Sequence, residues 1–517
     1  MVNLKLERET CKMISVDRKL TLSQFYEIIF NKQELEIEPD VLDTVEESHL
    51  FLRDFAQNKI IYGVNTGFGP MAQYRIRDED RHQLQYNLIR SHAAGTGDLL
   101  PPIQVKAAML TRLCNISKGK SGVHTSVINL LKELINREIT PVIFAHGGVG
   151  ASGDLVQLAH LALVLIGEGE VLFHGARRPT ADVFAEQGLK PIEVVVREGL
   201  SLINGTSVMT GIGLVNYFYA KKLLAWSVWL SCAMNEIVKA HDDHYSITLN
   251  AVKLHRGQNE IAGRMRMHLE DSPLIKKRED DLYSGNNQEE IFKDKVQEYY
   301  SLRCVPQILG PVLETIEQVG RVLEDELNSV SDNPIISVED KNVYHGGNFH
   351  GDYISLEMDK LKLAITRLTM LSERQLNYLM NTKINEILPP FVNMGKLGFN
   401  FGMQGAQFTA TSTTAENQTL STSMYVHSIP NNNDNQDIVS MGTNAAVLAN
   451  KVLLNSFEVL AIQMISIAQA VDILSYQNFV SSKTKAVYDE VRRIVPAFSD
   501  DRPLYPVIQK VKEFLMR

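Results

Sequence analysis

Four long amphipathic runs in the second part of the chain constrain its fold more than any other feature. Apolar residues recur in them at three- and four-residue spacing, which predicts helices that pack side by side. Several exceed the usual helix length, as in a parallel bundle. The last run is apolar around most of its circumference, which suits the centre of an oligomer or the core of one subunit. The runs cover residues 210–241, 307–329, 352–381 and 444–474.

The first two hundred residues have a different texture, with short helical stretches between Gly-rich loops. A short apolar run at 167–180 predicts a small hairpin. The turn residues of SDNPIIS at 331–337 end one of the long helices. We therefore predict a mainly α protein, with an N-terminal active-site domain of loops and short strands over residues 1–200 and a long central helical bundle over 201–517. The Gly-rich loops are 62–69, 92–97 and 146–154.

Composition excludes several classes. The 517 residues are 44% hydrophobic and carry a net charge of −9 with dispersed basic residues, which argues against a nucleic-acid partner. No apolar run reaches the length of a membrane span, and the N-terminal fifteen residues lack the apolar core of a secretory signal. The cysteines are far apart and form no C-x-x-C pair, so we predict a reducing cytoplasmic location. They are Cys11, Cys114, Cys232 and Cys304.

The strongest chemical signal is Ala151-Ser152-Gly153 in a Gly-rich loop that leads into a helix. Gly153 lacks side-chain bulk, so its nitrogen can approach the Ala151 carbonyl carbon in a strained turn. Cyclisation and loss of water would give a methylidene-imidazolone, an electrophile that no ordinary side chain provides. The alternative is a plain helix start capped by Ser152 or Asp154, and the tripeptide alone favours that alternative.

The motifs around the tripeptide decide between these interpretations. YGVNTGFG, GASGDLVQLAH, LINGTSVMTG, YSLRCVPQILG, DNPII, GGNFHGD and NQDIVSMG resemble, in order and spacing, those of the histidine, phenylalanine and tyrosine ammonia-lyases from about residue 20 to the end. The resemblance implies a mostly helical homotetramer, an aromatic amino acid as substrate, and a 4-methylidene-imidazol-5-one formed autocatalytically from Ala151-Ser152-Gly153 as the only cofactor. It also implies that subunits share active sites, so that residues after 300 serve a neighbour's electrophile.

Removal of a β-proton from an amino acid requires a base over that carbon and a better leaving group than a free amine. Tyr62 matches the family's catalytic base, although a phenol ordinarily titrates near pH 10 and needs electrostatic help. Arg303 matches the clamp for the substrate carboxylate, a bidentate task that suits guanidinium. Without the resemblance, Tyr62 would be a packed loop aromatic and Arg303 an ion-paired residue at a helix start.

Other positions match residues that surround the electrophile and the substrate in this family. Tyr300 and Asn204 match residues around the electrophile and the carboxylate. Asn333 and Phe349 match positions that line the site. Asn435 and Gln436 match polar contacts to substrate and prosthetic group. For each of them the alternative is capping or buried hydrogen bonding.

Two histidine clusters resemble metal sites by composition. Adjacent residues of HDDH at 241–244 point in different directions on a helix, so we predict a solvated helical face there. His345 and His350 flank GGNF without the spacing of metal ligands. We predict no metal.

The residues that choose the amino acid disagree with one another. Ser91-His92 precedes A-A-G-T-G, and this pair is associated with histidine ammonia-lyases, as is Glu416, although phenylalanine enzymes also carry that carboxylate. Histidine enzymes read N-Q-E-D-H where this chain has Gln436 and Ile438, as in the phenylalanine and tyrosine enzymes. The whole chain is most similar to bacterial tyrosine ammonia-lyases that retain Ser-His, so we predict conversion of L-tyrosine to p-coumarate, with His92 at the phenol.

Three alternatives remain open at this point. Histidine ammonia-lyase, which makes urocanate, shares the chemistry. A tyrosine aminomutase shares the first half of the reaction and returns the amine to the β-carbon. An inactive helical scaffold would have to lack Ser152, Tyr62 or Arg303, and this chain has all three.

Overall fold

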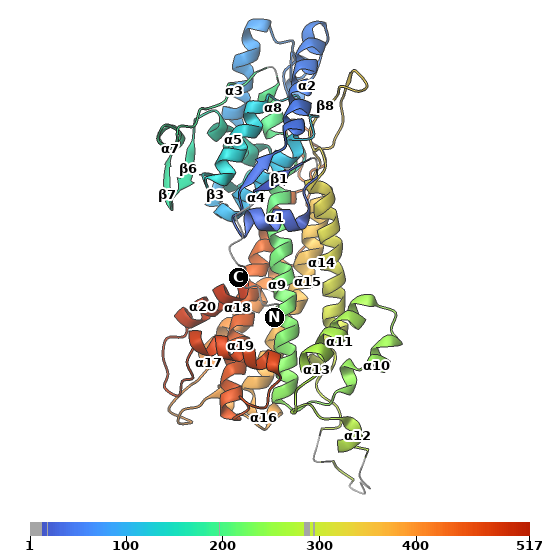
Figure 1. Ribbon diagram of the computed structural model, residues 1–517, viewed down its shortest axis with the longest axis vertical. Coiled ribbons are helices and arrows are strands. Elements are labelled where there is room, and N and C mark those ends of the chain that lie inside the picture. Colours follow the sequence, from blue (N-terminus) through green and yellow to red (C-terminus); the bar gives the residue numbers. More distant parts are fainter. Residues whose placement is uncertain (1–12, 18, 196, 284–289, 293–294) are drawn as a thin grey trace.

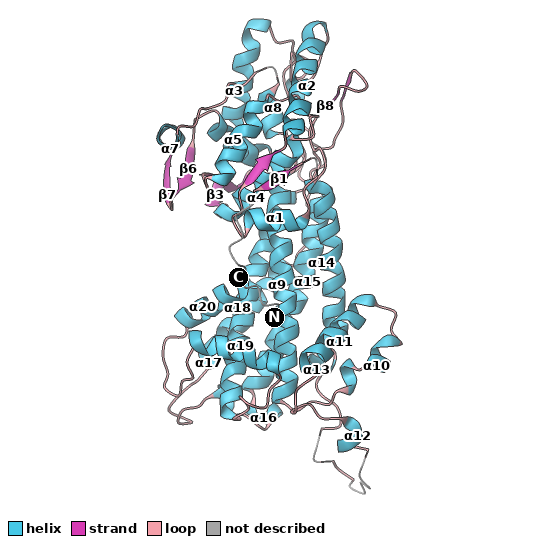
Figure 2. Ribbon diagram, viewed as in Figure 1, coloured by secondary structure: helices cyan, strands magenta, loops and turns pink. Residues whose placement is uncertain are grey.

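The protein, described here from a computed structural model, is an elongated and mainly helical molecule (Figure 1). Long helices run along its long axis, and the short strands gather toward one end among shorter helices (Figure 2). This arrangement confirms the predicted fold class. The described residues are 13–17, 19–195, 197–283, 290–292 and 295–517. The predictions for the N-terminal segment and for Cys11 lie outside them.

Four helices form the central bundle, and they confirm the four predicted runs within a few residues. Each packs against at least two of the others, with α15 against α18 as the most extensive pairing. Their apolar faces turn inward; in α14, for example, Leu309, Leu313 and Ile316 are buried at three- and four-residue spacing. The bundle helices are α9 (Ser207–Ile237), α14 (Val305–Leu327), α15 (Asp352–Met380) and α18 (Gly442–Ile473).

Helix α18 corrects the expectation that no run is apolar enough to cross a membrane. Its mean hydropathy reaches 1.5 over an 18-residue window, which meets that test by length and composition. However, 67% of this window is buried inside the protein, against the other bundle helices. A core helix has the same composition as a membrane span, and α18 occupies the core of this bundle.

The N-terminal part surrounds the start of α9 with short helices. Helix α4 packs lengthwise on α9, where Gly211 comes so close that an added Cβ would lie 2.5 Å from the Ala108 nitrogen. The helices of the N-terminal part are α1 (Leu22–Ile29), α2 (Pro39–Phe55), α3 (Arg81–His92), α4 (Pro102–Ile116), α5 (Thr125–Asn136), α6 (Leu155–Leu165), α7 (Thr180–Gln187) and α8 (Glu198–Ile203).

The strands form small, separate sheets. β1 pairs with β2 in parallel, β3 with β5 and β8 with β9 antiparallel, and β4, β6 and β7 make a three-stranded antiparallel sheet. The β6–β7 pair is the hairpin predicted at 167–180. The strands are β1 (Ile14–Val16), β2 (Leu35–Ile37), β3 (Thr96–Leu99), β4 (Thr140–Pro141), β5 (Phe144–His146), β6 (Glu170–Phe173), β7 (Ala176–Pro179), β8 (Ile335–Ser337) and β9 (Asn342–Tyr344).

Shorter helices cover the other end of the bundle. One hydrophobic core runs through the bundle into the N-terminal part, since Leu113 of α4 and Ile212 of α9 belong to the same buried cluster. The division into domains at residue 200 stays a prediction. The remaining helices are α10 (Ile247–Ala251), α11 (Arg256–Leu269), α12 (Arg278–Asp281), α13 (Tyr300–Arg303), α16 (Thr382–Asn385), α17 (Gln404–Leu420), α19 (Ser482–Ile494) and α20 (Tyr505–Met516).

Candidate active site

The Ala151-Ser152-Gly153 turn is a tight backbone structure between β5 and α6. Gly153 has φ +76° and forms an isolated bridge with Gly205, and a Cβ added to Gly153 would lie 2.0 Å from the Gly205 carbonyl oxygen. Only glycine fits such a position, because both the positive φ and the contact exclude a side chain. The sequence therefore places glycine where the backbone of the turn is pressed against a second glycine loop.

Hydrogen-bond donors converge on Ser152. The Asn204 side chain donates from Nδ2 to the Ser152 carbonyl oxygen at 3.0 Å, and the Gly205 amide donates to the same oxygen at 3.4 Å. The Gln436 side chain donates from Nε2 to the Ser152 hydroxyl at 2.9 Å. Two donors on one carbonyl oxygen draw electron density from it, which is the arrangement that stabilises developing negative charge.

Asp154 locks this turn to two bundle helices. Its amide donates to the Gly205 carbonyl at 2.8 Å, and its buried carboxylate accepts from the Val208 and Met209 amides at 2.8 and 2.9 Å. Thr443, at the start of α18, donates to the other carboxylate oxygen. Burial raises the pKa of Asp154 to about 6. Asp154 thus occupies the N-cap position of α6 but satisfies the first amides of α9 instead.

Tyr62 stands in the 62–69 loop on another side of the turn. The Gly69 amide donates to the Tyr62 phenol oxygen at 3.0 Å, and the Phe68 ring meets the Tyr62 ring edge-on at 6.1 Å. An amide that donates to a phenol oxygen stabilises negative charge on that atom. The half-buried phenol therefore has one source of the electrostatic help that a phenolate base requires.

Ser91 and His92 form the last turn of α3. His92 Nδ1 lies 2.9 Å from the Leu88 carbonyl oxygen, and the Ser91 hydroxyl donates to the same oxygen at 3.1 Å. Because a carbonyl oxygen only accepts, the hydrogen of the neutral imidazole belongs on Nδ1 and Nε2 is left as an acceptor. The Leu88 carbonyl thus orients His92 and favours the tautomer with its hydrogen on Nδ1, which also lies 3.1 Å from the Ser91 hydroxyl oxygen.

Tyr62, Ser152, Asn204, Gln436 and the Ser91-His92 pair line one cavity of about 900 Å³. We call the end of the molecule that contains it the pocket end. The cavity brings together nine of the predicted site residues: Tyr62, Ser91, His92, Ser152, Asn204, Asn333, Phe349, Asn435 and Gln436.

The last four of these nine correct one expectation from sequence. Residues after 300 were expected to serve a neighbouring subunit's electrophile, yet Asn333, Phe349, Asn435 and Gln436 line the cavity of their own chain. The reason lies in the chain path. The loops after α14 and before α18 return to the end of the bundle at which α9 begins, beside Ser152.

A left-handed turn presents Gln436 to Ser152. Asn432, Asn433 and Asp434 all have φ between +53° and +56°, a conformation in which Asn and Asp are enriched. Two backbone hydrogen bonds between Asn431 and Gln436, at 3.2 and 3.3 Å, close this turn. The Asn-rich sequence therefore holds one amide side chain over the Ala151-Ser152-Gly153 turn.

Three predicted site residues lie away from this cavity. Gln375 of α15 bonds both Ser231 of α9 and the Ser301 carbonyl at 2.9 Å, so α13, with Tyr300 and Arg303, lies beside Ser231. Ser231 follows Ser207 by 24 positions on α9, which is about 36 Å of helix. We call this the far end. The separation prevents Tyr300 and Arg303 from reaching their own chain's cavity.

Glu416 is the third of these residues. It lies on α17, where its carboxylate pairs with Lys451 at 2.6 Å and accepts from Asn455 at 2.7 Å. The Lys451 ammonium group lowers the pKa of Glu416, with a smaller contribution from Asn455. Within its own chain Glu416 belongs to an ion pair on the bundle and not to the cavity wall.

Sequence reasoning missed several residues of the cavity. Leu84 and Leu88 line it from the same face of α3 as Ser91, and this three- and four-residue spacing was a signal that could have found them. His345, considered in the sequence only as a metal ligand, also lines it, and burial lowers its pKa. Asn432 had no such signal, because its place depends on the left-handed turn.

The prediction of a solvated helical face for HDDH is wrong. α9 ends at Ile237, and after a turn His241 and Asp242 precede a short 3-10 helix (Asp243–Tyr245), so the four residues do not share one helix face. The His241 and His244 side chains are 4% and 8% exposed, and His241 Nε2 lies 2.9 Å from an Asp281 oxygen. Among the described residues, no three His, Cys, Asp or Glu side chains are arranged to hold a metal ion.

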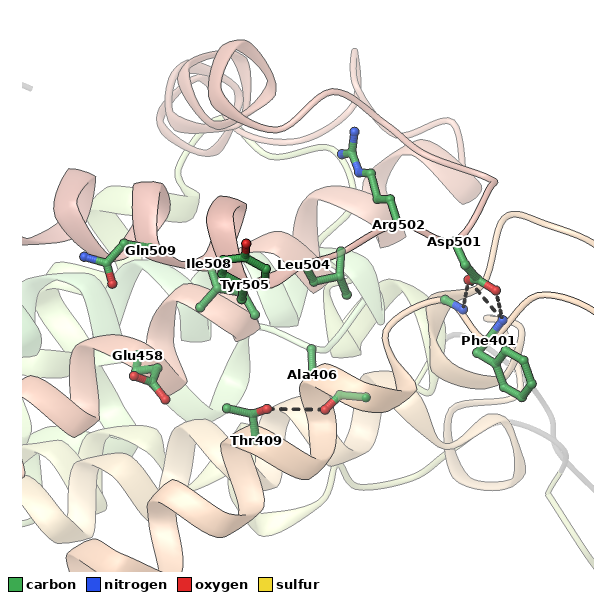
Figure 3. Close-up of a pocket in the computed structure, with 12 residues that line it drawn as sticks. Phe401, Ala406, Thr409, Glu458, Asp501, Arg502, Leu504, Tyr505, Ile508 and Gln509 are labelled. Carbon is green, nitrogen blue, oxygen red and sulfur yellow. Dashed lines mark hydrogen bonds between the residues drawn. The ribbon is translucent and has the colours of Figure 1, made fainter.

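A second cavity, of about 660 Å³, lies at the surface between α17, α18 and α20 (Figure 3). Its most polar corner is already engaged, since the Asp501 carboxylate accepts from the Phe401 and Gly402 amides at 2.9–3.1 Å. It contains none of the predicted site residues. The cavity at the pocket end is therefore the candidate active site.

Comparisons with known proteins agree along the whole chain. A family model described as aromatic amino acid lyase matches residues 20–493. Tyrosine 2,3-aminomutase of Myxococcus sp. (strain Mx-B0) is 38% identical over 499 residues, 95% of each chain, and histidine ammonia-lyase of Bacillus cytotoxicus is 37% identical over 497 residues, 96% of this chain and 95% of that one. The solved tyrosine aminomutase of Streptomyces globisporus superposes with a TM-score of 0.93 at 35% identity, covering 98% of this chain and 97% of the other.

Proposed function

The chain belongs to the aromatic amino acid lyase family and is a carbon–nitrogen lyase, and from this premise we propose that it eliminates ammonia from L-tyrosine to give trans-p-coumarate. One observation carries the proposal. Tyr62, the Ser152 turn and His92 line the same cavity. A base, an electrophile and a hydrogen-bond acceptor for a phenol can therefore contact one substrate there.

The turn fits a methylidene-imidazolone made from Ala151-Ser152-Gly153. Gly153 has the positive φ and the bare Cα that a close approach of its nitrogen to Ala151 requires. Asn204 and Gly205 hold the Ser152 carbonyl oxygen, and Gln436 holds the hydroxyl that water loss would remove. When present, this group supplies an electrophile that turns the substrate amine into a better leaving group.

Tyr62 then has the role of the base that takes the β-proton. Its phenol oxygen already accepts from the Gly69 amide, so negative charge there is stabilised before substrate enters. The proton moves from the β-carbon to this oxygen as the carbon–nitrogen bond breaks. Phe68, packed on the Tyr62 ring, keeps the phenol pointed into the cavity.

His92 is proposed to bind the substrate phenol. Its Nε2 can accept the phenol hydrogen because Nδ1 donates to the Leu88 carbonyl. Leu84 and Leu88 provide an apolar wall for the ring, and Ser91 is small enough to leave room beside it. A site that bonds a hydroxyl rejects the analogue without it by several kcal/mol, so phenylalanine should be a poor substrate.

We also propose a homotetramer in which Tyr300 and Arg303 complete a neighbour's cavity. The argument is the separation of the far end from the pocket end by about 36 Å along α9. Arg303 would there bind the substrate carboxylate through its two guanidinium nitrogens. A cytoplasmic location is part of the same proposal, because the described cysteines are all free.

Two other outcomes have specific support. The similarity to tyrosine 2,3-aminomutases favours return of the amine to the β-carbon as the second candidate. The pair Ser91-His92 and the similarity to histidine ammonia-lyases favour histidine as an alternative substrate. Against histidine stands Gln436, an amide where histidine enzymes carry a carboxylate.

The first experiment gives the purified enzyme tyrosine, histidine and phenylalanine separately. The near-ultraviolet spectrum follows the acrylate formed, and chromatography of the tyrosine reaction looks for β-tyrosine. We expect a p-coumarate band with tyrosine and little product from the other two amino acids. A urocanate band with histidine alone would overturn the substrate, and β-tyrosine as the main product would replace the lyase with an aminomutase.

The variant His92→Leu sharpens this result. Loss of the acceptor nitrogen removes the reason to prefer a phenol, so kcat/KM for tyrosine should fall by about ten- to a hundredfold relative to that for phenylalanine. Ser91→Ala is the matched control, because it shortens the neighbouring side chain without removing Nε2. An unchanged tyrosine-to-phenylalanine ratio in His92→Leu would show that His92 does not contact the ring.

A further inference from the structure

The four-residue helix α13 carries Tyr300 and Arg303, and its own sequence does not hold it in place. A helix of one turn is unstable alone, and α13 has no side-chain bond at its N-cap. Tyr299 and Tyr300 are 46% and 69% exposed. Leu302 is fully buried and α14 begins at Val305, so the bundle holds the C-terminal end of α13. The N-terminal end, with Tyr300, depends on the residues that precede it, and through them the setting of the Arg303 side chain does too.

On one side, the segment 295–303 is attached to α15. Lys295 donates from Nζ to the Tyr378 hydroxyl at 2.6 Å and to the Ile384 carbonyl at 3.0 Å. The Tyr299 ring meets the Tyr378 ring edge-on at 5.4 Å. Further along, Gln375 bonds the Ser301 carbonyl. These contacts attach the segment to α15 and to the short helix α16 that follows it.

On the other side, Arg278 of α12 attaches the same segment to the HDDH turn. Its guanidinium donates to both Asp243 carboxylate oxygens, at 2.7 and 3.3 Å, and its third nitrogen donates to the Val296 carbonyl at 2.9 Å. The Arg278 side chain is only 15% exposed. The Arg278 side chain thus joins the HDDH turn that follows α9 to the segment that leads into α13.

The HDDH turn itself is firmly bonded. The Asp242 amide donates to the Lys276 carbonyl and the Lys276 amide to the Ala240 carbonyl, each at 3.0 Å. His241 is paired with Asp281. Burial lowers the pKa of His244 to about 4, and the charge of Arg303 also contributes, since α13 lies close by. Asp243 therefore lies in a turn whose backbone is held in place by hydrogen bonds.

We propose that Arg278, held by Asp243, is a positioning residue that sets where Arg303 is presented to the neighbouring subunit's active site. The proposal rests on the proposed function in one respect, the role of Arg303 as carboxylate clamp. Within this segment Val296, Tyr299 and Tyr300 are exposed, so the part before Ser301 has little packing of its own, and loss of the Val296 bond frees it from the HDDH turn. A displaced clamp weakens substrate binding and leaves the electrophile intact.

The test compares the assembled enzyme with the variant Arg278→Met, using hydrogen exchange, intact mass and kinetics with tyrosine. We expect faster amide exchange in residues 295–303, a KM raised by roughly ten- to a hundredfold with kcat nearly unchanged, and the same mass loss from electrophile formation. Arg278→Lys, which keeps one donor and the charge, should lie between the wild type and Arg278→Met.

The matched control is Arg264→Met, which removes a half-exposed arginine of α11 that pairs with Glu260 on its own helix. It should change neither the exchange of 295–303 nor KM. Unchanged exchange and KM in Arg278→Met would overturn the proposal, as would a loss of kcat and electrophile together. If the wild-type enzyme is inactive on tyrosine, the proposed function is refuted. Faster amide exchange at 295–303 in Arg278→Met would then still show that Arg278 anchors this segment.

Discussion

The pocket end and the far end hold their functional side chains by different means. At the pocket end, Ser152 receives three hydrogen bonds, and the Gly153–Gly205 contact leaves no space for a side chain. At the far end, Tyr300 is 69% exposed, and the Arg303 guanidinium stacks 4.7 Å from the Tyr300 ring and donates to Gln297. The pocket end is built from side-chain amides and backbone groups held around a glycine contact, and the far end from long side chains on a short helix.

This difference teaches what each part of the reaction demands. Bond making and breaking requires donors that are fixed before the substrate arrives, and the side-chain amides of Asn204 and Gln436 and the backbone amide of Gly205 provide them. A carboxylate clamp acts through one long, charged side chain, so the subunit that provides it can differ from the subunit that holds the other catalytic groups. Four experiments test this division, beginning with the largest expected effect.

Ser152→Ala should remove the function of the pocket end entirely. Without the hydroxyl the electrophile cannot form, so kcat should fall by at least about a thousandfold while the fold and the assembly persist. Intact mass is the direct measurement: wild type should be lighter than its sequence by two waters, and the variant should have its full mass. Active wild-type protein of unmodified mass would contradict the mechanism.

Tyr62→Phe should remove only the base. We expect kcat to fall by about a hundred- to ten-thousandfold with little change in KM and with the electrophile still formed. Steady-state kinetics and intact mass measure these two properties separately. Phe68→Leu, which alters the packing beside the phenol, is the control and should cost far less. Ordinary turnover in Tyr62→Phe would remove Tyr62 from the role of base.

Subunit mixing tests whether the two ends serve different cavities. Ser152→Ala and Arg303→Met should each be nearly inactive alone. Co-expressed in equal amounts, they should recover about a quarter of wild-type activity, because some cavities then combine an intact Ser152 with a neighbour's intact Arg303. A mixture as inactive as its parents would show that both residues must come from one chain.

Glu416→Gln should have the smallest effect. Glu416 is paired with Lys451 and Asn455 on its own bundle, so removal of its charge should change kcat/KM for tyrosine less than about threefold, as expected for an exposed ion pair. Lys451→Met is the matched control. A drop above a hundredfold in Glu416→Gln alone would mean that this carboxylate contacts substrate in the assembled enzyme.

The helices could be predicted from the sequence because their apolar periodicity is encoded locally, whereas the electrophile was predicted only through the motifs that surround the tripeptide and stays a prediction. The apolar periodicity at 307–329 predicts α14. Cyclisation of Ala151-Ser152-Gly153 requires a residue without a side chain at position 153, and the structure leaves no space for one there. Tyr62 and His92 entered through the resemblance to a family, and their hydrogen bonds to Gly69 and Leu88 give physical reasons for their places.

What the sequence could not provide depends on how distant segments meet. HDDH was interpreted as a helix face, but α9 ends four residues before it, and burial against the 276–281 segment decides its role. Similarly, the loop with Asn435 and Gln436 returns to its own chain's cavity, which only the path between α17 and α18 determines. Tertiary contacts of this kind have no local periodicity to reveal them.

In the proposed tetramer the length of α9 also ties catalysis to the amount of protein present. With Asn204 at one end and α13 beside the other, a dissociated chain would hold every group of the reaction and complete none of it. Specific activity should then decline on dilution as assemblies fall apart, and recover on reconcentration. A cell that makes the chain at low copy number would store dormant polypeptide, and product would appear only once synthesis passes a threshold.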